Sequence, residues 1–420
     1  MFRSSLFPLI LLTGAAAAAQ TGQTSGQTPA QTAPATAAQT APGAQAPAAA
    51  MPAPAPVIAA KWKRKQAEDL LAYIDTIGTE GLDPADYNPG RLRDALAAKT
   101  EDVHAIATST FMKVANDLMF GHVRGDARVD WYVKDDDWSV YDQQALLDAA
   151  LADDGGIAAT MRSLLPTHPQ YAGLKTLLTS EKDAATKDKI RLNMDRWRWL
   201  PRDLGKKYVI VNVPAYTVSL VENGETLSRR RAVAGAVKTP TPQLSVNVTG
   251  AIFNPWWEVP KSIESEVRGK RGYVAVKDPA TGKVVRWRQP PGPSNALGRV
   301  KLVMYNPHAI YLHDTNARNL FNKQARAFSH GCIRTEDAVG FAATLLEGTE
   351  WTAEKVNQTV ASGKSVQANL AAPVPVYIVY FTVAATSDGP PAKYADMYSR
   401  DGKALAALNA RSGGSALASK

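Results

Sequence analysis

Cys332 is the only cysteine in this chain of 420 residues, and its neighbours are residue types that activate a thiol. It lies in the segment AFSHGCIRTEDA, after Ser329, His330 and Gly331 and shortly before Arg334. A cysteine nucleophile needs a general base within hydrogen-bond reach and donors for the oxyanion that forms on the attacked carbonyl. Cationic side chains beside the sulfur also favour thiolate over thiol. The segment therefore predicts a reactive cysteine; the alternative is an inert, buried thiol in a turn with unrelated histidines nearby.

The residues that follow the cysteine predict a helix. Thr335 is a favourable N-cap, two acidic residues come next, and Gly348 is a stop signal. We therefore expect Cys332 to lie just ahead of a helix N-terminus, whose dipole favours the thiolate. Gly331 allows a tight turn, so that the amides beside the cysteine point at one spot and form an oxyanion hole.

His313 is the candidate base among the six histidines. In the segment AIYLHDT, strand alternation puts Tyr311 and His313 on the face opposite the core, towards a cleft or solvent. Nineteen residues separate His313 from Cys332, which is enough for the chain to leave the strand, loop and return. Asp314 falls on the other face, so we expect a backbone carbonyl, and not this carboxylate, to orient the imidazole.

The elements that position these residues fall into two regions. From 59 to 200 apolar residues recur at helical spacing, and the last helix is stopped by Pro201. From 201 to 386, β-branched runs are separated by turn signals such as Asn223-Gly224, which predicts short strands in a sandwich or barrel. The expected fold class is α+β and multi-domain, with a helical N-terminal scaffold domain followed by a mostly β domain.

The remaining segments are predicted to lie outside these domains. Residues 1–19 resemble a secretory signal peptide, and their apolar run is too short for an ordinary membrane span. Residues 20–58 are rich in Ala, Pro, Gln and Thr and predict a disordered linker. Residues 387–420 predict a tail with one short helix in GKALAALNA and a Gly/Ser-rich end. We therefore expect an exported, periplasmic protein with no membrane span in its mature form.

Charge narrows the choice of partner. The net charge of +9 is modest, and the Lys and Arg residues are scattered, so no nucleic-acid partner is expected. An exported basic protein fits an anionic partner such as a cell-wall polymer.

Residues 258–293 form a basic insertion that we call the capping segment. It carries eight basic and four acidic residues, with Trp256 and Trp257 at its start and Trp287 near its end. It is either a solvated surface hairpin with DPATGK as its turn, or a mobile flap over the active site. A basic flap would attract substrate carboxylates and exclude water.

The pair IYLHDT and SHGCIR resembles the active-site signature of the L,D-transpeptidases with a YkuD-type catalytic domain. The stretches LNMDRWRWLPRDLG, NPWWEVP, PPGPSNALG and VPVYIVYFTVAATSDG are similar to the larger Gram-negative branch, which carries an N-terminal helical scaffold domain. The resemblance spans roughly residues 60 to 400. It implies that Cys332 is the nucleophile and His313 the proton donor and acceptor. It also implies supporting or substrate-binding roles for Ser329, His330, Gly331, Arg334 and Tyr311.

The same resemblance implies an acyltransferase of cell wall biogenesis and remodelling. Such an enzyme forms 3→3 crosslinks between diamino-acid residues of peptidoglycan stems through a cysteine thioester. It is inhibited by carbapenems and needs no metal or cofactor. Three alternatives stay open: an L,D-carboxypeptidase or endopeptidase, transfer of stems onto an envelope protein, and a non-enzymatic wall-binding scaffold. The chain departs from many members of the branch because it leaves no room for a small peptidoglycan-binding domain before NMDRWRWLP. Its capping segment is also shorter.

Overall fold

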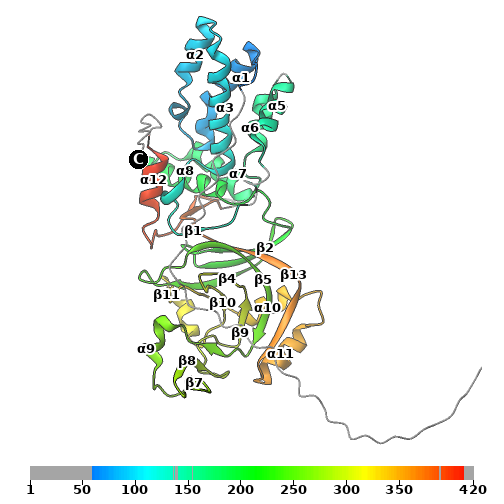
Figure 1. The fold of residues 1–420 in the computed structure, drawn as a ribbon, viewed down its shortest axis with the longest axis vertical. Coiled ribbons are helices and arrows are strands. Elements are labelled where there is room, and N and C mark those ends of the chain that lie inside the picture. The colour runs from blue at the N-terminus through cyan, green and yellow to red at the C-terminus, as the bar shows by residue number, and fades with distance from the viewer. Residues whose placement is uncertain (1–58, 136, 138–140, 154, 387–388, 411–420) are drawn as a thin grey trace, which may run out of the picture. The chain divides into compact units, whose positions relative to one another are not determined.

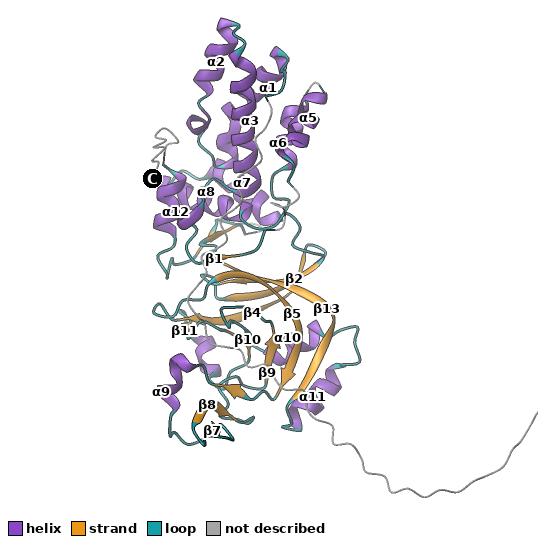
Figure 2. Cartoon of the chain, viewed as in Figure 1, coloured by secondary structure: helices purple, strands orange, loops and turns teal. Residues whose placement is uncertain are grey.

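The computed structural model describes residues 59–135, 137, 141–153, 155–386 and 389–410. The predicted signal peptide, the linker and the Gly/Ser-rich end lie outside the described residues. Within the described part, a helical N-terminal region is followed by a mostly β region, which confirms the predicted α+β, multi-domain fold class (Figure 2).

Amphipathic helices build the N-terminal region, because each has an apolar stripe that must be buried. In α3 the spacing of Val103, Ala107, Phe111, Val114 and Leu118 predicts one apolar stripe; the last four are 0% exposed, and Val103 is partly buried against the same core. The helices α1 and α2 pack against α3 and against each other (Figure 1). None of the helices in the described residues is long and apolar enough to cross a bilayer. The described α-helices of this region are α1 (Arg64–Thr76), α2 (Pro89–Ala98), α3 (Asp102–Phe120), α5 (Gln143–Ala152), α6 (Gly156–Ser163), α7 (Pro169–Ser180) and α8 (Ala184–Arg198).

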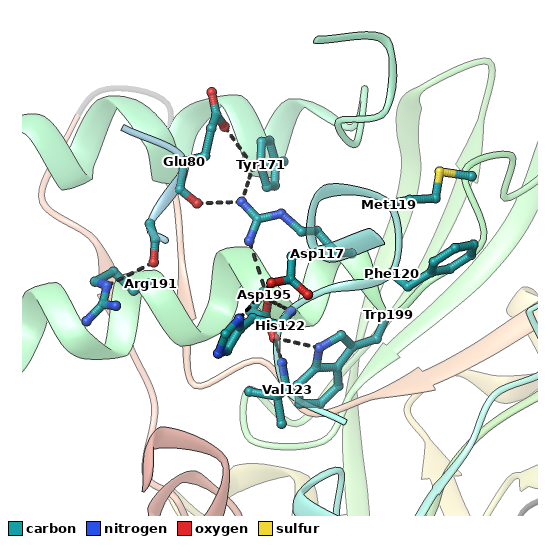
Figure 3. Close-up of polar contacts among 12 residues, drawn as sticks. Glu80, Asp117, Met119, Phe120, His122, Val123, Tyr171, Arg191, Asp195 and Trp199 are labelled. Carbon is teal, nitrogen blue, oxygen red and sulfur yellow. Dashed lines mark hydrogen bonds and ion pairs between the residues drawn. The ribbon is translucent and has the colours of Figure 1, made fainter. Parts of the chain in front are cut away.

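A buried carboxylate, Asp195 on α8, ties this helix to the chain that leaves α3. Figure 3 shows it among His122, Val123 and Trp199. It accepts the backbone N–H of His122 at 2.6 Å, that of Val123 at 3.0 Å and the Trp199 indole N–H at 2.9 Å. It also pairs with the buried guanidinium of Arg198 at 3.4 Å. A carboxylate with this many partners fixes the end of α8, from which the β region begins.

The β region is a sheet that closes on itself. The strand order is β5-β13-β2-β3-β4-β12-β10-β9, and β9 pairs with β5 again. The predicted hairpin turn lies between β3 and β4, where Asn223 and Gly224 both have positive φ angles of 51° and 82°. The strands of this sheet are β1 (Trp131–Tyr132), β2 (Lys207–Asn212), β3 (Thr217–Glu222), β4 (Glu225–Gly235), β5 (Gln243–Phe253), β9 (Val300–Val303), β10 (Leu312–His313), β11 (Ala327–Ser329), β12 (Ile333–Thr335) and β13 (Val366–Val379).

Two helices, α10 and α11, belong to the β region, and the C-terminal segment contains a helix that packs against α8. The predicted short helix near the C-terminus is present as α12. The residues around it are bonded to distant parts of the chain, since Arg400 Nη2 lies 2.6 Å from Asp130 Oδ2 and Asp401 Oδ1 lies 2.7 Å from Arg196 Nη2 on α8. The elements are α10 (Ala338–Leu345), α11 (Ala353–Ala361), β14 (Val383–Ala384), β15 (Ala392–Lys393) and α12 (Asp401–Leu408).

The capping segment has a small core and sheet of its own. Its three strands are ordered β6-β8-β7, and the predicted DPATGK turn joins β7 to β8. Val259, Ile263 and Val267 form its buried core, with Trp257, Tyr273 and Trp287 packed against them. It is therefore more than a solvated hairpin. Its elements are β6 (Trp257–Glu258), α9 (Glu264–Val267), β7 (Val274–Lys277) and β8 (Val284–Gln289).

Candidate active site

The pairing of β10 with β12 brings the two principal site residues together. The strands are parallel, with His313 opposite Arg334 and Leu312 opposite Ile333. Because side chains alternate along a strand, Tyr311 and His313 share one face with Cys332 and Arg334. Standard strand spacings put Cys332 and His313 about 8 Å apart at Cα, as diagonal neighbours. The predicted loop and return of the chain between them is therefore observed.

The thiol of Cys332 is half-buried and surrounded by polar groups of the preceding strand. Its Sγ lies 3.5 Å from the carbonyl oxygen of Ala309, to which the thiol donates. The backbone N–H and the hydroxyl of Tyr311 both donate towards the sulfur. These donors lower the pKa of the Cys332 thiol, as do the charges of Lys301 and Arg334, but burial outweighs them and raises it above its ordinary value. Arg334 therefore favours the thiolate as expected, but burial disfavours the charged form more than the neighbouring groups favour it.

The predicted helix dipole does not act on the thiol either. Thr335 belongs to strand β12, and α10 begins only at Ala338. Its N-cap is Asp337, whose side chain accepts the N–H of Gly340. The expectation that Cys332 lies just ahead of a helix N-terminus is thus wrong, because a short strand that pairs with both β4 and β10 intervenes.

His313 has the predicted orienting group. Its Nδ1 bonds to the backbone carbonyl of Asp314, whereas the carboxylate of Asp314 accepts the N–H of Arg299 at 2.9 Å and Arg318 Nη2 at 3.1 Å. Burial, with the nearby charges of Arg334 and Lys301, lowers the pKa of His313 to about 3. The imidazole is therefore neutral near pH 7 and able to accept a proton.

The burial and the hydrogen bonds of His313 narrow its role further. Tyr311 and His313 occupy the predicted face, but both are buried, at 7% and 6% exposure, and neither faces solvent. Within the described residues no hydrogen bond joins His313 to Cys332, whose thiol donates to Ala309 instead. A rotation of the cysteine side chain is needed before the two can exchange a proton.

The residues before the cysteine shape its loop. Ser329 is buried; its hydroxyl donates to the carbonyl of Cys332 and accepts the N–H of Gly331 at 3.1 Å. That amide is consequently already bonded to Ser329 and is not one of the amides left to bind an oxyanion. The φ angle of Gly331 is +113°, and a Cβ there would lie 3.1 Å from Ile310 Cδ1, so glycine is required. His330 points out of the loop and is half-exposed.

Arg334 has a counterpart that sequence reasoning missed. Lys301 on β9 lies directly opposite His313, on the side away from Arg334. Its Nζ lies 4.1 Å from the ring centroid of Tyr311, and burial lowers the pKa of its ammonium group. The sequence did contain a sign of this residue, because a lysine between Val300 and a leucine in an otherwise apolar strand marks a candidate site residue.

The capping segment contacts the site at two points. The Trp257 indole donates to the hydroxyl of Tyr311, the same group that faces the thiol. Glu266 Oε1 on α9 lies 3.5 Å from His330 Nε2. The segment thus covers both the base strand and the cysteine loop.

Hydrogen bonds from Thr241, Tyr398 and Arg400 support the cysteine loop, and we call these three residues the brace. Thr241 is fully buried; its Oγ1 donates to the carbonyl of Gly331 at 2.7 Å and accepts the N–H of Gly235 at 2.9 Å. The Tyr398 hydroxyl donates to the carbonyl of Gly235 at 2.6 Å, and Arg400 Nη2 donates to that of Thr241 at 3.0 Å. No local pattern in the sequence links these residues to the cysteine.

No group of three His, Cys, Asp or Glu side chains in the described ranges is arranged to hold a metal ion.

Two family models match this chain. Residues 206–366 match the L,D-transpeptidase catalytic domain, YkuD, and residues 58–178 match a scaffold domain. A curated protein of Haemophilus influenzae, provisionally named an L,D-transpeptidase, is 29% identical over 237 residues, which cover 50% of this chain and 47% of that protein. This chain therefore spans just under half the length of that relative.

Solved structures of L,D-transpeptidases match part of this chain. An L,D-transpeptidase from Mycobacterium smegmatis is 14% identical with a TM-score of 0.22, covering 41% of this chain and 58% of that one. L,D-transpeptidase 3 from Mycobacterium tuberculosis is 14% identical with a TM-score of 0.23, covering 41% of this chain and 61% of that one.

Proposed function

The chain carries an L,D-transpeptidase catalytic domain of the YkuD family behind a scaffold domain, and from this we propose that it crosslinks peptidoglycan stems through a Cys332 thioester. The observation that carries the proposal is the register of β10 and β12, which sets Cys332 beside Tyr311 and His313 beside Arg334 on one face. A half-buried thiol on the same sheet face as a neutral imidazole supplies a nucleophile and a base, and wall binding alone requires neither.

In the first half-reaction, a donor tetrapeptide stem is cleaved. The Cys332 side chain rotates towards His313, and its proton passes to the imidazole as the sulfur attacks the carbonyl of the diamino-acid L-centre. The Tyr311 hydroxyl and the two neighbouring cations stabilise the negative charge on sulfur. The bond to the terminal D-alanine breaks, its nitrogen takes the proton from His313, and a thioester remains.

In the second half-reaction, the thioester acylates an acceptor stem. His313 removes a proton from the side-chain amine of the acceptor, and the amine attacks the thioester carbonyl. The sulfur leaves and recovers the proton, and a 3→3 amide joins two stems. The energy of the old amide bond is conserved in the thioester, so the reaction needs no ATP. If water replaces the amine, the same site acts as an L,D-carboxypeptidase.

The location and inhibition of the enzyme follow from the same chemistry. We propose that it is exported to the periplasm, as the signal-like residues 1–19 suggest. A carbapenem carbonyl is a strained mimic of the donor amide, so carbapenems should acylate Cys332.

The test is to incubate purified protein with disaccharide tetrapeptides and read the products by mass spectrometry. We expect 3→3 dimers, free D-alanine, and an acyl adduct on the intact protein. Cys332→Ala should lose all three, together with the carbapenem adduct. Tripeptide without dimer would favour the carboxypeptidase, transfer to an added lysine-bearing envelope protein would favour attachment, and an adduct on the alanine variant would refute the nucleophile.

A further inference from the structure

Two cations flank His313 in one row across three strands. Lys301 on β9 and Arg334 on β12 are each opposite His313 on β10, one on either side. Residues opposite one another in neighbouring strands point to the same face, so all three side chains face the side that carries Cys332. Adjacent strands are spaced by about 4.8 Å, so the two cations bracket an interval of about 10 Å at the backbone.

Neither cation has an anionic partner in the described residues. No ion pair or hydrogen bond engages the ammonium of Lys301 or the guanidinium of Arg334, and Arg334 Nε is buried without an acceptor. Glu258 attracts Lys301 electrostatically, but Glu258 is already paired with Arg286 Nε at 3.0 Å. Since Cys332 and His313 are neutral at rest, the face carries positive charge with nothing to balance it. Partly buried cations of this kind are expected to bind an anion.

We propose that Lys301, together with Arg334, binds the terminal carboxylate of the donor stem and so selects donors that end in a free D-amino acid. The inference rests on the proposed function. In such a donor the carboxylate is attached to the carbon next to the leaving nitrogen, only a few bonds from the carbonyl that Cys332 attacks. A group held beside Tyr311 and His313 is therefore within reach when the sulfur is in place.

The binding of a carboxylate also prepares the base. Lys301 and Arg334 both lower the pKa of His313, because their charges disfavour an imidazolium between them. An anion that neutralises them removes this repulsion, and His313 then accepts the thiol proton more readily. The donor would accordingly activate the site that cleaves it, and a donor without the carboxylate would lose turnover as well as affinity.

The experiment compares two synthetic tetrapeptide donors, one ending in a free D-alanine carboxylate and one in D-alaninamide. Acylation of the unmodified protein is followed by intact mass, and kcat/KM is determined for each donor. We expect the free acid to be preferred by about 10- to 100-fold, as loss of a charged hydrogen bond implies. If the unmodified protein showed equal kcat/KM for the acid and amide donors, that result alone would overturn the proposal.

Variants then locate the preference. Lys301→Met should lower kcat/KM for both donors, because Lys301 also stabilises the charge on sulfur, but the acid donor should lose more than the amide donor by most of that factor. Lys301→Arg should restore much of the preference. Lys189→Met, an exposed lysine on α8, is the matched control. Equal losses with both donors would assign Lys301 to the thiolate and overturn its role in binding the carboxylate. If neither donor acylates the protein, the proposed function itself fails and the inference fails with it.

Discussion

The thiol and the imidazole of this site are both neutral at rest. Burial raises the pKa of Cys332, and burial with two neighbouring cations lowers that of His313 to about 3. The site therefore differs from cysteine enzymes that hold a ready thiolate–imidazolium pair. Proton transfer must accompany substrate binding, which restricts reaction with stray electrophiles.

The first prediction concerns this protonation state. The rate of Cys332 alkylation by iodoacetamide should rise with pH as the thiol ionises, with a midpoint above the ordinary value of about 8.5. Tyr311→Phe removes a hydrogen bond to the sulfur that lowers its pKa, so the midpoint should move higher still. Mass spectrometry over a pH series measures the rate. A rate that is already flat from pH 5 to 8 would mean that the thiolate is preformed.

The second prediction separates two histidines near the site. His313→Ala should reduce acylation by about 10²–10⁴-fold, because it removes the general base. His308→Ala is the control, since the His308 ring packs at a tilt against Tyr132, with centroids 4.2 Å apart, and has no hydrogen bond to the sulfur. Single-turnover rates with a carbapenem compare them. Equal losses would contradict the assignment of the base.

At this scale, residue types and spacing were enough to predict that the chain returns Cys332 to the strand of His313 and that a backbone carbonyl orients the imidazole. They did not find Lys301 or the protonation state of the thiol. Burial is a property of everything packed around a residue, including Trp257 from a segment far away in sequence, so no local pattern contains it.

Among the elements, the capping segment has the clearest functional consequence. Replacing 270–283 by a short Gly-Ser linker removes β7 and its turn but keeps β6 and α9, which contact the site. The third prediction is a higher ratio of hydrolysed to crosslinked product, because water then reaches the thioester. Carbapenem acylation of Cys332 should change little.

Mass spectrometry of products from native stems measures this ratio. Substitution of Pro279 and Ala280 within the exposed turn is the control, because it leaves both strands in place. An unchanged ratio in the shortened protein would show that the segment does not exclude water.

The fourth prediction concerns the buried carboxylate of α8. Asp195→Ala leaves Nη1 of the buried Arg198 guanidinium and several N–H donors without this acceptor, and should lower the free energy of unfolding by about 3–5 kcal/mol. Asp188→Ala on the same helix breaks a half-exposed pair with Arg191 and should cost about 0–1 kcal/mol. Urea denaturation measures both. Comparable effects would mean that burial does not distinguish these pairs.

Elements governed by local chemistry were predictable, including the α3 stripe and the Asn223-Gly224 hairpin. The start of α10 was not, because β12 takes up Thr335 through pairing with strands distant in sequence. Helix capping rules depend only on local residues, and they favoured Thr335 as the N-cap. In the structure the N-cap is Asp337, which has a positive φ angle.

Over the whole molecule, the sequence predicted a helical region followed by a mostly β region. It did not predict which strands pair to close the sheet. Closure depends on β5 pairing with β9 and on β13 pairing in parallel with β2, partners separated by long stretches of chain. The C-terminal segment shows the same limit. Its composition predicted a tail with a helix, yet Tyr398 and Arg400 support the loop that carries the cysteine.

The fifth prediction tests this support. Tyr398→Phe removes the hydroxyl that donates to Gly235 and should reduce acylation roughly three- to tenfold, the worth of one net hydrogen bond, while the protein stays folded. Tyr394→Phe is the control: the hydrogen bond recorded for that residue is a backbone one, from its N–H to the Thr382 carbonyl, which the substitution retains. Circular dichroism checks that each variant is folded, and acylation kinetics measure the loss of rate. Full activity in Tyr398→Phe would show that the brace is dispensable.

The position of this brace in the chain sets the time at which the site is completed during synthesis. Every strand of the closed sheet precedes Tyr398, and so does Cys332. A growing chain has therefore made its nucleophile well before it makes the groups that hold the loop of Gly331 through Thr241. A chain that stops before Tyr398 would therefore contain the nucleophile and every strand of the closed sheet but would lack the hydrogen bonds that support the cysteine loop.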